Sequence, residues 1–480
     1  MVISARNVAF TGLSLLVTLG AFALGARGDV GHQSFKAFYC AGVAVREHRD
    51  PYRVEPLRSC ERELERDVMP AGYVEPAPLP GYVLLPFALL SKLPPKQAAE
   101  LFCIVLALAA VASARCLAAA TNASDTAILL AFTPLTLLNV AYGETAPLAM
   151  LSICAAAYFL SKHRWIAAGC AASLALLQPN VGVPAVVAMF LFVHRSRVAV
   201  IVSVAVLAVL SVAALGVAEN KEYFAQVLPL MAYAELVASD QYSLSRLLFV
   251  AGISPPLALL LGKIWFACAA VFGVVLAGAF AARNRQDVLV PLLPPAAVLF
   301  FGIYLHDIQI LIALPAAFAI ALRVPAGAFR VIGAGALALL TAVWTQKISR
   351  ATAALDVAGV FGGLYAVLGG SVGRRVAIAS IGAVATTLCV ALVVHLQPPP
   401  AAAQIVTHAF NASPDEFSPE AWARYLRATA ELTRQTFAPQ LAAWLGLFGL
   451  LASAVAAAVR PPDASSSAPP EDYARPILIA

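Results

Sequence analysis

The sequence predicts an all-α polytopic membrane protein. Hydrophobic residues make up 61% of the 480-residue chain and charged residues only 12%, so lipid must solvate much of its apolar surface. Apolar runs recur along the whole chain, many of them long enough to cross roughly 30 Å of hydrocarbon as a helix. Backbone groups in lipid must bond within their own segment, which favours helices, and no run alternates in polarity as a membrane β-strand does.

These runs predict about twelve to fourteen transmembrane helices. They lie near residues 7–26, 97–119, 125–141, 146–161, 165–177, 181–194, 198–218, 258–282, 288–304, 308–322, 329–346, 353–371, 375–396 and 440–459. Segments 78–94 and 243–257 are apolar but flanked by Pro and polar residues, which is typical of re-entrant or interfacial pieces. We therefore expect one transmembrane domain over residues 1–459. A disordered cytoplasmic tail, rich in Pro and Ser, follows over 460–480.

A large polar loop, residues 27–96, follows the first helix. It holds nineteen of the chain's Lys, Arg, Asp and Glu residues. Arg6 precedes the first apolar run as in a signal sequence, but the many later spans predict that this helix is retained as an anchor. Short basic loops recur farther along the chain, and the positive-inside rule places them in the cytoplasm, with Lys347 and Arg350 as an exception. These basic loops are 162–164, 194–197, 283–285, 323–330 and 373–375.

The remaining polar segments then share the outer face. They are the loops 27–96, 219–242 and 397–439 and the short stretches 143–144, 178–180 and 306–307. Ser418-Pro419-Glu420 is a helix-start pattern, and it predicts an amphipathic helix over 419–436 that lies on the outer leaflet. This convergence predicts an active site on the periplasmic or outer face of the cell inner (plasma) membrane.

Four residues of the large loop attract attention. Asp29 and His32, just beyond the first helix, have the chemistry to deprotonate a hydroxyl nucleophile, although a solvated helix flank would look the same. Cys40 and Cys60 lie in the same loop. In an oxidising compartment they could form a disulfide, and two free thiols are the alternative.

Several short stretches, taken in order, resemble glycosyltransferase family 87 of the GT-C superfamily of membrane transferases. The resemblance covers roughly residues 1–330 and rests on residues 34–42 with 50–52, 79–94, 142–145, 177–180, 240–244 and 304–307. It implies a GT-C-like fold and an inverting transfer of a sugar, often mannose. The donor would be a polyprenyl-phosphate sugar and the acceptor a lipid or glycan.

The resemblance also implies site residues. Ser34, Lys36, Tyr39, Gln178 and Asn180 would bind substrate, and His306 would bind the donor phosphate with Asp307 orienting it. The family has an Asp where this chain has Ser34, and serine cannot act as a general base near neutral pH. Asp29 or His32 could take that role, Glu144 (in place of a family Gln) is a further candidate, and an inactive protein is the remaining alternative.

Other function classes fit less well. A transporter or flippase of lipid-linked sugars should show inverted repeats and ionisable residues in the middle of its spans, which are nearly free of charge here. The sequence shows no metal-ligand cluster and no glycine-rich phosphate loop, so we expect neither metal nor cofactor. The net charge of +6 is mild and does not predict nucleic-acid binding. Lipid is the expected surrounding partner.

Overall fold

The computed structural model describes residues 5–26, 33–64, 74–238, 240–284, 287–324, 327–344, 350–396, 412–430 and 437–459. Across these ranges the chain is helical, and β-pairing is limited to the isolated bridges Arg53–Phe417 and Gln241–His306. The all-α prediction is confirmed. Four of the predicted features lie outside the described residues: Asp29, His32, Lys347 and the tail 460–480.

Each predicted span coincides with a helix. Seven described helices are long and apolar enough to cross a membrane, which confirms the polytopic class. They contain α1 (Ala5–Ala26), α5 (Pro95–Thr121), α6 (Asp125–Tyr142), α10 (Arg197–Glu222), α13 (Pro255–Arg283), α18 (Val372–Leu396) and α20 (Ala438–Val459). The other predicted spans coincide with helices of 10 to 18 residues. They are α7 (Ala146–Ser161), α8 (Trp165–Leu174), α9 (Pro179–Phe192), α14 (Leu289–Val298), α15 (Leu314–Arg323), α16 (Ala328–Thr341) and α17 (Arg350–Val367).

Short helices form the centre of the molecule. Every residue of α14 is buried, as are Ile308–Ala313 and most of α15. A helix that is apolar all round belongs inside a large protein or in lipid, and α14 lies inside, against α9, α13 and α15. Long helices such as α10, α13 and α18 instead expose many Val, Leu and Ile side chains, as a lipid-facing surface requires.

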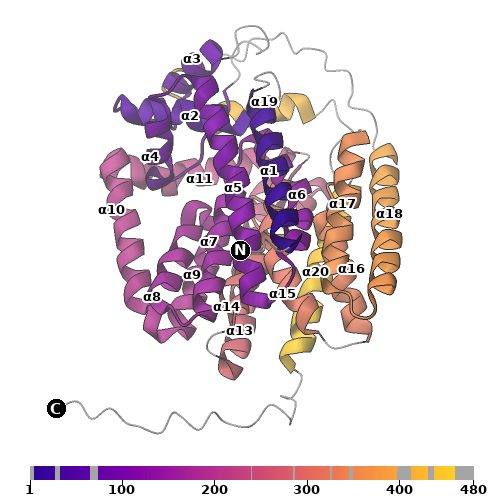
Figure 1. The fold of residues 1–480 in the computed structure, drawn as a ribbon. Coiled ribbons are helices and arrows are strands. Elements are labelled where there is room, and N and C mark those ends of the chain that lie inside the picture. Colours follow the sequence, from indigo (N-terminus) through magenta and orange to yellow (C-terminus); the bar gives the residue numbers. More distant parts are fainter. Residues whose placement is uncertain are drawn as a thin grey trace, which may run out of the picture.

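The large loop folds into a second core at one end of the bundle. Its helices α2 (Gln33–Arg46), α3 (Val54–Leu64) and α4 (Gly81–Leu90) lie at the same end as α19 (Ser418–Ala430) (Figure 1). Rings of Phe35, Phe38, Phe87 and Phe102 pack together there. The two predicted re-entrant pieces appear as α4 and α12 (Leu244–Val250).

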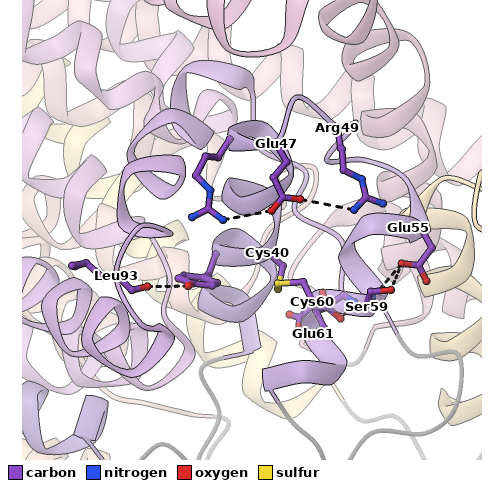
Figure 2. The surroundings of a disulfide bond; sticks show 11 residues. Cys40, Glu47, Arg49, Glu55, Ser59, Cys60, Glu61 and Leu93 are labelled. Carbon is purple, nitrogen blue, oxygen red and sulfur yellow. Dashed lines mark hydrogen bonds and ion pairs between the residues drawn. A yellow bond between two sulfur atoms is a disulfide. The ribbon is translucent and has the colours of Figure 1, made fainter.

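Covalent and ionic contacts hold this end together. Cys40 of α2 and Cys60 of α3 form a disulfide (Figure 2). The Arg53 guanidinium lies 3.7 Å from the centre of the Phe417 ring and forms an ion pair with Glu222 at 2.9 Å. Arg53 therefore connects the segment that begins at residue 412 with the large loop and with the end of α10.

Candidate functional site

A cavity of about 620 Å³ lies beneath the large loop and α19. It is of the size that usually holds a small ligand. Four helices, α2, α9, α13 and α19, contribute to its walls. So do the short elements η3 (Tyr223–Val227), α11 (Leu228–Ala234) and η4 (Glu235–Val237). The remaining lining residues lie in the segments 74–80, 142–145, 177–180 and 303–309. Segments distant in sequence thus meet around one space.

The cavity gathers most of the predicted site residues. Its lining includes Ser34, Glu144, Gln178, Asn180, His306 and Asp307. Lys36 and Tyr39 lie elsewhere: both are buried in α2, outside the cavity lining. The Tyr39 hydroxyl donates to the Leu93 carbonyl at 2.9 Å. Their substrate-binding role stays a prediction, as does the role of Asp29 and His32.

A tight turn brings Glu144 to Ser34. Helix α6 ends in Gly143, whose φ of +75° favours glycine. A Cβ on Gly143 would lie 2.4 Å from the Phe35 Cβ, so glycine also permits the close approach of α2. The Glu144 backbone N–H donates to the Asn139 carbonyl at 2.9 Å and fixes the turn.

The turn leaves the Glu144 carboxylate among neutral donors. The Ser34 hydroxyl and the Thr145 backbone N–H both donate to it. Burial raises the pKa of Glu144, because the charged form loses water, while the Ser34 hydrogen bond and the nearby His306 oppose that rise. This carboxyl group is therefore a stronger base than an exposed one.

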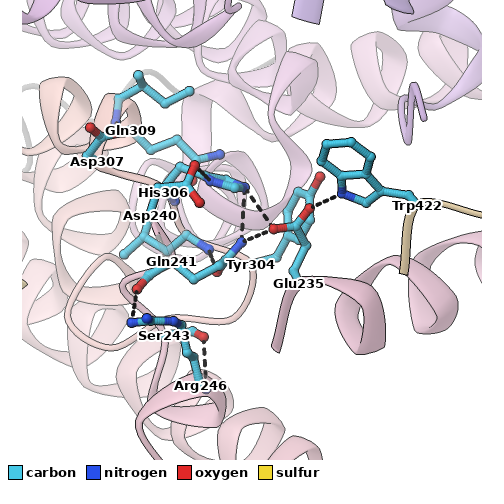
Figure 3. A network of polar contacts seen from close by, with 12 residues as sticks. Glu235, Asp240, Gln241, Ser243, Arg246, Tyr304, His306, Asp307, Gln309 and Trp422 are labelled. Atoms are coloured by element: carbon cyan, nitrogen blue, oxygen red, sulfur yellow. Dashed lines mark hydrogen bonds and ion pairs between the residues drawn. The ribbon is translucent and has the colours of Figure 1, made fainter. Parts of the chain in front are cut away.

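A second polar cluster surrounds His306 (Figure 3). Its Nδ1 lies 3.0 Å from Asp240 Oδ2, and its Nε2 lies 3.0 Å from Gln241 Nε2 and 3.8 Å from Glu235 Oε2. Burial alone would lower the pKa of the imidazole, but Asp240, Glu235 and Glu144 raise it to about 10.

The protonation state of His306 follows from these neighbours. The Gln241 amide suits a neutral ring that accepts at Nε2, whereas three carboxylates favour a charged ring that forms an ion pair with Glu235 on that side. We assign the charged form, because three nearby anions outweigh one amide contact. Asp240 contacts the ring, and Asp307 Oδ1 accepts from the Ile308 backbone N–H at 2.8 Å. The role predicted for Asp307 in orienting His306 stays a prediction.

The same cluster contains possible metal ligands. One ligand atom each of Glu235, Asp240 and His306 lies within 4.8 Å of the others, which would suit a divalent cation. However, Asp240 approaches Nδ1 and Glu235 approaches Nε2, so an ion on one ring nitrogen would face away from the carboxylate at the other. We interpret the cluster as an ion-paired histidine.

One side of the cavity is apolar and exposed. Val183 of α9, Phe224 of η3 and Leu228 of α11 line the cavity and are also exposed at the protein surface. Lys263, an exposed residue of α13, borders the same space. The cavity therefore opens between apolar helices rather than only toward water.

Sequence reasoning missed several lining residues. Glu235 gave no signal, and Asp240 was noted only as part of the stretch 240–244. Trp422 lies in the segment 419–436, which was predicted as an amphipathic helix on the outer leaflet and not as part of the site. It lines the cavity instead, and its indole N–H donates to Glu235 Oε1 at 3.0 Å. The Gln241–His306 bridge joins segments whose proximity no local pattern reveals.

The fold and the site together define a helical integral membrane protein with a cavity that is polar inside and apolar on one exposed side. A model of glycosyltransferase family 87 matches residues 78–302. The match confirms the resemblance seen in the motifs and indicates a membrane glycosyltransferase. It includes Glu144, Gln178 and Asp240 but ends before His306. Comparisons with curated proteins and with solved structures gave no match.

Proposed function

We propose that the protein transfers a sugar, with mannose as the expected one, from a polyprenyl-phosphate donor to a lipid or glycan acceptor. The reaction inverts the anomeric carbon and takes place at the outer face of the cytoplasmic membrane. The observation that carries this proposal is the division of the cavity into a polar interior and an apolar, exposed side. A lipid-linked sugar has the same division, with a polar head and a hydrocarbon tail.

The cationic side of the cavity suits the donor phosphate. Departure of the lipid phosphate leaves negative charge, which a fixed cation stabilises. Charged His306 supplies such a cation inside the cavity, and Lys263 supplies another at its apolar side. The Asn180 amide donates to the Tyr304 carbonyl at 3.3 Å and so supports the loop that carries His306.

The outer-face location draws on two features. The disulfide between Cys40 and Cys60 belongs to an oxidising compartment. The helices of the large loop and α19 lie together at the end of the bundle that carries this disulfide (Figure 1). The basic short loops predict the cytoplasm for the opposite end.

The test uses purified protein in lipid nanodiscs with polyprenyl-phosphate mannose and a panel of lipid and glycan acceptors. We expect sugar transfer from the lipid-linked donor and none from a nucleotide-linked sugar. His306→Ala and Lys263→Met should raise the KM for the donor. Lys221→Met serves as the matched control, because Lys221 is an exposed residue outside the cavity lining.

Two outcomes would overturn the proposal. Transfer from a nucleotide sugar would replace the lipid-linked donor. Measurable movement of lipid-linked sugar across the bilayer without transfer to any acceptor would identify a flippase, the alternative left open by the sequence.

A further inference from the structure

Three features of the cavity wall converge on one carboxylate. Glu144 lines the cavity, the Ser34 hydroxyl donates to it, and a buried amide of Gln178 lies beside its neighbour Thr145. We propose that Glu144 is the catalytic base, that Ser34 is its positioning residue, and that Gln178 binds a hydroxyl group of the acceptor. The inference rests on the proposed sugar transfer and specifies which residues activate the acceptor.

The backbone holds Glu144 in a fixed place. Gly143 and Glu144 both donate their backbone N–H to the Asn139 carbonyl, at 2.8 and 2.9 Å. The Asn139 amide in turn donates to the Ile308 carbonyl at 2.9 Å. The turn that carries the base is thus bonded to the segment that follows His306. A base must be held within hydrogen-bond reach of the proton it removes. These bonds fix the turn that carries Glu144 relative to the segment that follows His306.

The two acids beside His306 are already engaged by other side chains. Partial loss of water would raise the pKa of the half-exposed Asp240, but its contact with the charged ring of His306 at 3.0 Å outweighs this and keeps that pKa low. Glu235 accepts from the Trp422 indole at 3.0 Å and from the Gln241 amide at 3.1 Å. Ion pairing weakens a carboxylate as a base. Asp240 is thus a weaker base than Glu144, and both oxygens of Glu235 already accept hydrogen bonds.

Gln178 supplies an independent sign of a ligand. Its Nε2 donates to the Thr145 hydroxyl oxygen at 3.2 Å. Its Oε1 is buried and, among the described residues, has no hydrogen-bond partner. With the amide turned round, the nitrogen would be left unpaired instead. A buried polar atom without a partner is unfavourable, and a sugar hydroxyl entering the cavity would satisfy it in either case.

The reaction step balances as follows. A carboxylate oxygen of Glu144 takes the proton of the acceptor hydroxyl. The acceptor oxygen forms a bond to the anomeric carbon of the donor sugar from one face. The bond from that carbon to the phosphate oxygen breaks on the opposite face, and its electron pair leaves with the polyprenyl phosphate. Bulk water later takes the proton from Glu144.

The experiment compares Glu144→Gln, Ser34→Ala, Gln178→Leu and the double variant Ser34→Asp with Glu144→Gln. Glu63→Gln is the matched control, since Glu63 is an exposed residue of α3. We expect Glu144→Gln to lower kcat by at least about 100-fold, the usual contribution of a general base, with donor binding unchanged. The double variant returns the carboxylate from the other side of the same hydrogen bond. Its kcat should be at least tenfold higher than that of Glu144→Gln.

Ser34→Ala separates a positioning role from a merely structural one. The Ser34 hydrogen bond lowers the pKa of Glu144, so its loss should move the acidic limb of the kcat/KM profile to higher pH. Gln178→Leu should raise the KM for the acceptor and leave the KM for the donor unchanged.

The possible results distinguish this inference from the proposed function. If the wild-type protein transfers sugar and Glu144→Gln keeps more than half of the rate, Glu144 is not the base. If Glu144→Gln fails to fold, as shown by a lost thermal transition, the double variant decides: an active double variant supports the base, and a folded, inactive one contradicts it. If the wild-type protein transfers no sugar from any lipid-linked donor, the proposed function itself fails.

Discussion

Asp240→Asn offers a direct test of the charge on His306. The substitution keeps an oxygen that can accept from Nδ1, where Asp240 Oδ2 now lies at 3.0 Å. It removes the negative charge that does most to hold the proton on the ring. The imidazole pKa of about 10, compared with 6.5 for an ordinary histidine, should therefore fall.

The size of the change can be worked out. The rise from 6.5 to about 10 corresponds to roughly 5 kcal/mol in favour of the charged ring. A carboxylate in direct contact contributes about 1 to 3 pKa units of such a rise, and the half-exposed position of Asp240 argues for the middle of that range. We expect a pKa of about 8 in the variant, since Glu235 and Glu144 still favour the charged form.

The sign of the pH dependence follows. A raised pKa in the folded state stabilises the protein fully below the unfolded value of 6.5, and this contribution is lost as the pH rises through about 10. In Asp240→Asn the loss should occur through about pH 8. At pH 9 the variant would hold roughly one charged ring in ten, so its KM for the donor should rise about tenfold between pH 7 and pH 9.

The assay measures the donor KM and the thermal midpoint at pH 7 and pH 9 for both proteins. The wild-type KM should change little over this range. Asp415→Asn is the control, because Asp415 is exposed and outside the cavity lining. Equal pH responses in the wild-type protein and Asp240→Asn would show that Asp240 does not hold the proton on His306, and the assignment of a charged ring would be withdrawn.

Three further substitutions test the framework of the site. Gly143→Ala should lower the free energy of unfolding by about 2 to 4 kcal/mol and abolish transfer, because its φ is +75° and a Cβ would lie 2.4 Å from an atom of α2. Gly252→Ala is the control, because Gly252 has a φ of +93° but no atom within 4 Å of an added Cβ. It should lower the free energy of unfolding only by the backbone strain of a positive φ. Cys60→Ser should lower the free energy of unfolding by about 3 kcal/mol without changing the donor KM, as read from thermal denaturation under non-reducing conditions. Trp422→Phe removes one donor to a buried carboxylate; a thermal midpoint equal to wild type would contradict its role in holding α19.

The positions of the helices could be predicted from the sequence. A long apolar run can be recognised from the composition of its own residues, whatever the rest of the chain does. Each of the fourteen predicted spans therefore coincides with a helix. Their lengths were harder to predict. The run 288–304 gave only the ten residues of α14, because the chain then turns before His306, with Phe301 and Tyr304 at positive φ.

The sequence could also have predicted on which side of a helix a residue lies. Ser34 and Phe38 are four residues apart in α2 and both line the cavity, as helix geometry requires. Lys36 is two residues from each and therefore points to the opposite side, where it is buried. The prediction that Lys36 binds substrate came from the motif without this periodicity, and it stays a prediction.

The His306 cluster could not be predicted in the same way. Asp240 and His306 are 66 residues apart, with α12, α13 and α14 between them. Their contact depends on how those helices pack, which no local pattern encodes. Glu235 is less visible still, since a single acid at the end of a short helix looks like a solvated helix flank.

The two polar clusters divide the cavity electrostatically, and this division bears on catalysis. Inversion requires a base on one face of the anomeric carbon and stabilisation of the leaving phosphate on the other. Glu144 and His306 are close enough that His306 lowers the pKa of Glu144 and Glu144 raises that of His306. A donor phosphate bound to His306 would offset the positive charge of the ring. The opposing influence on Glu144 would then weaken, and its carboxylate would become more basic once the donor is in place. The protein would thus remove the acceptor proton most readily when the sugar to be transferred is already bound.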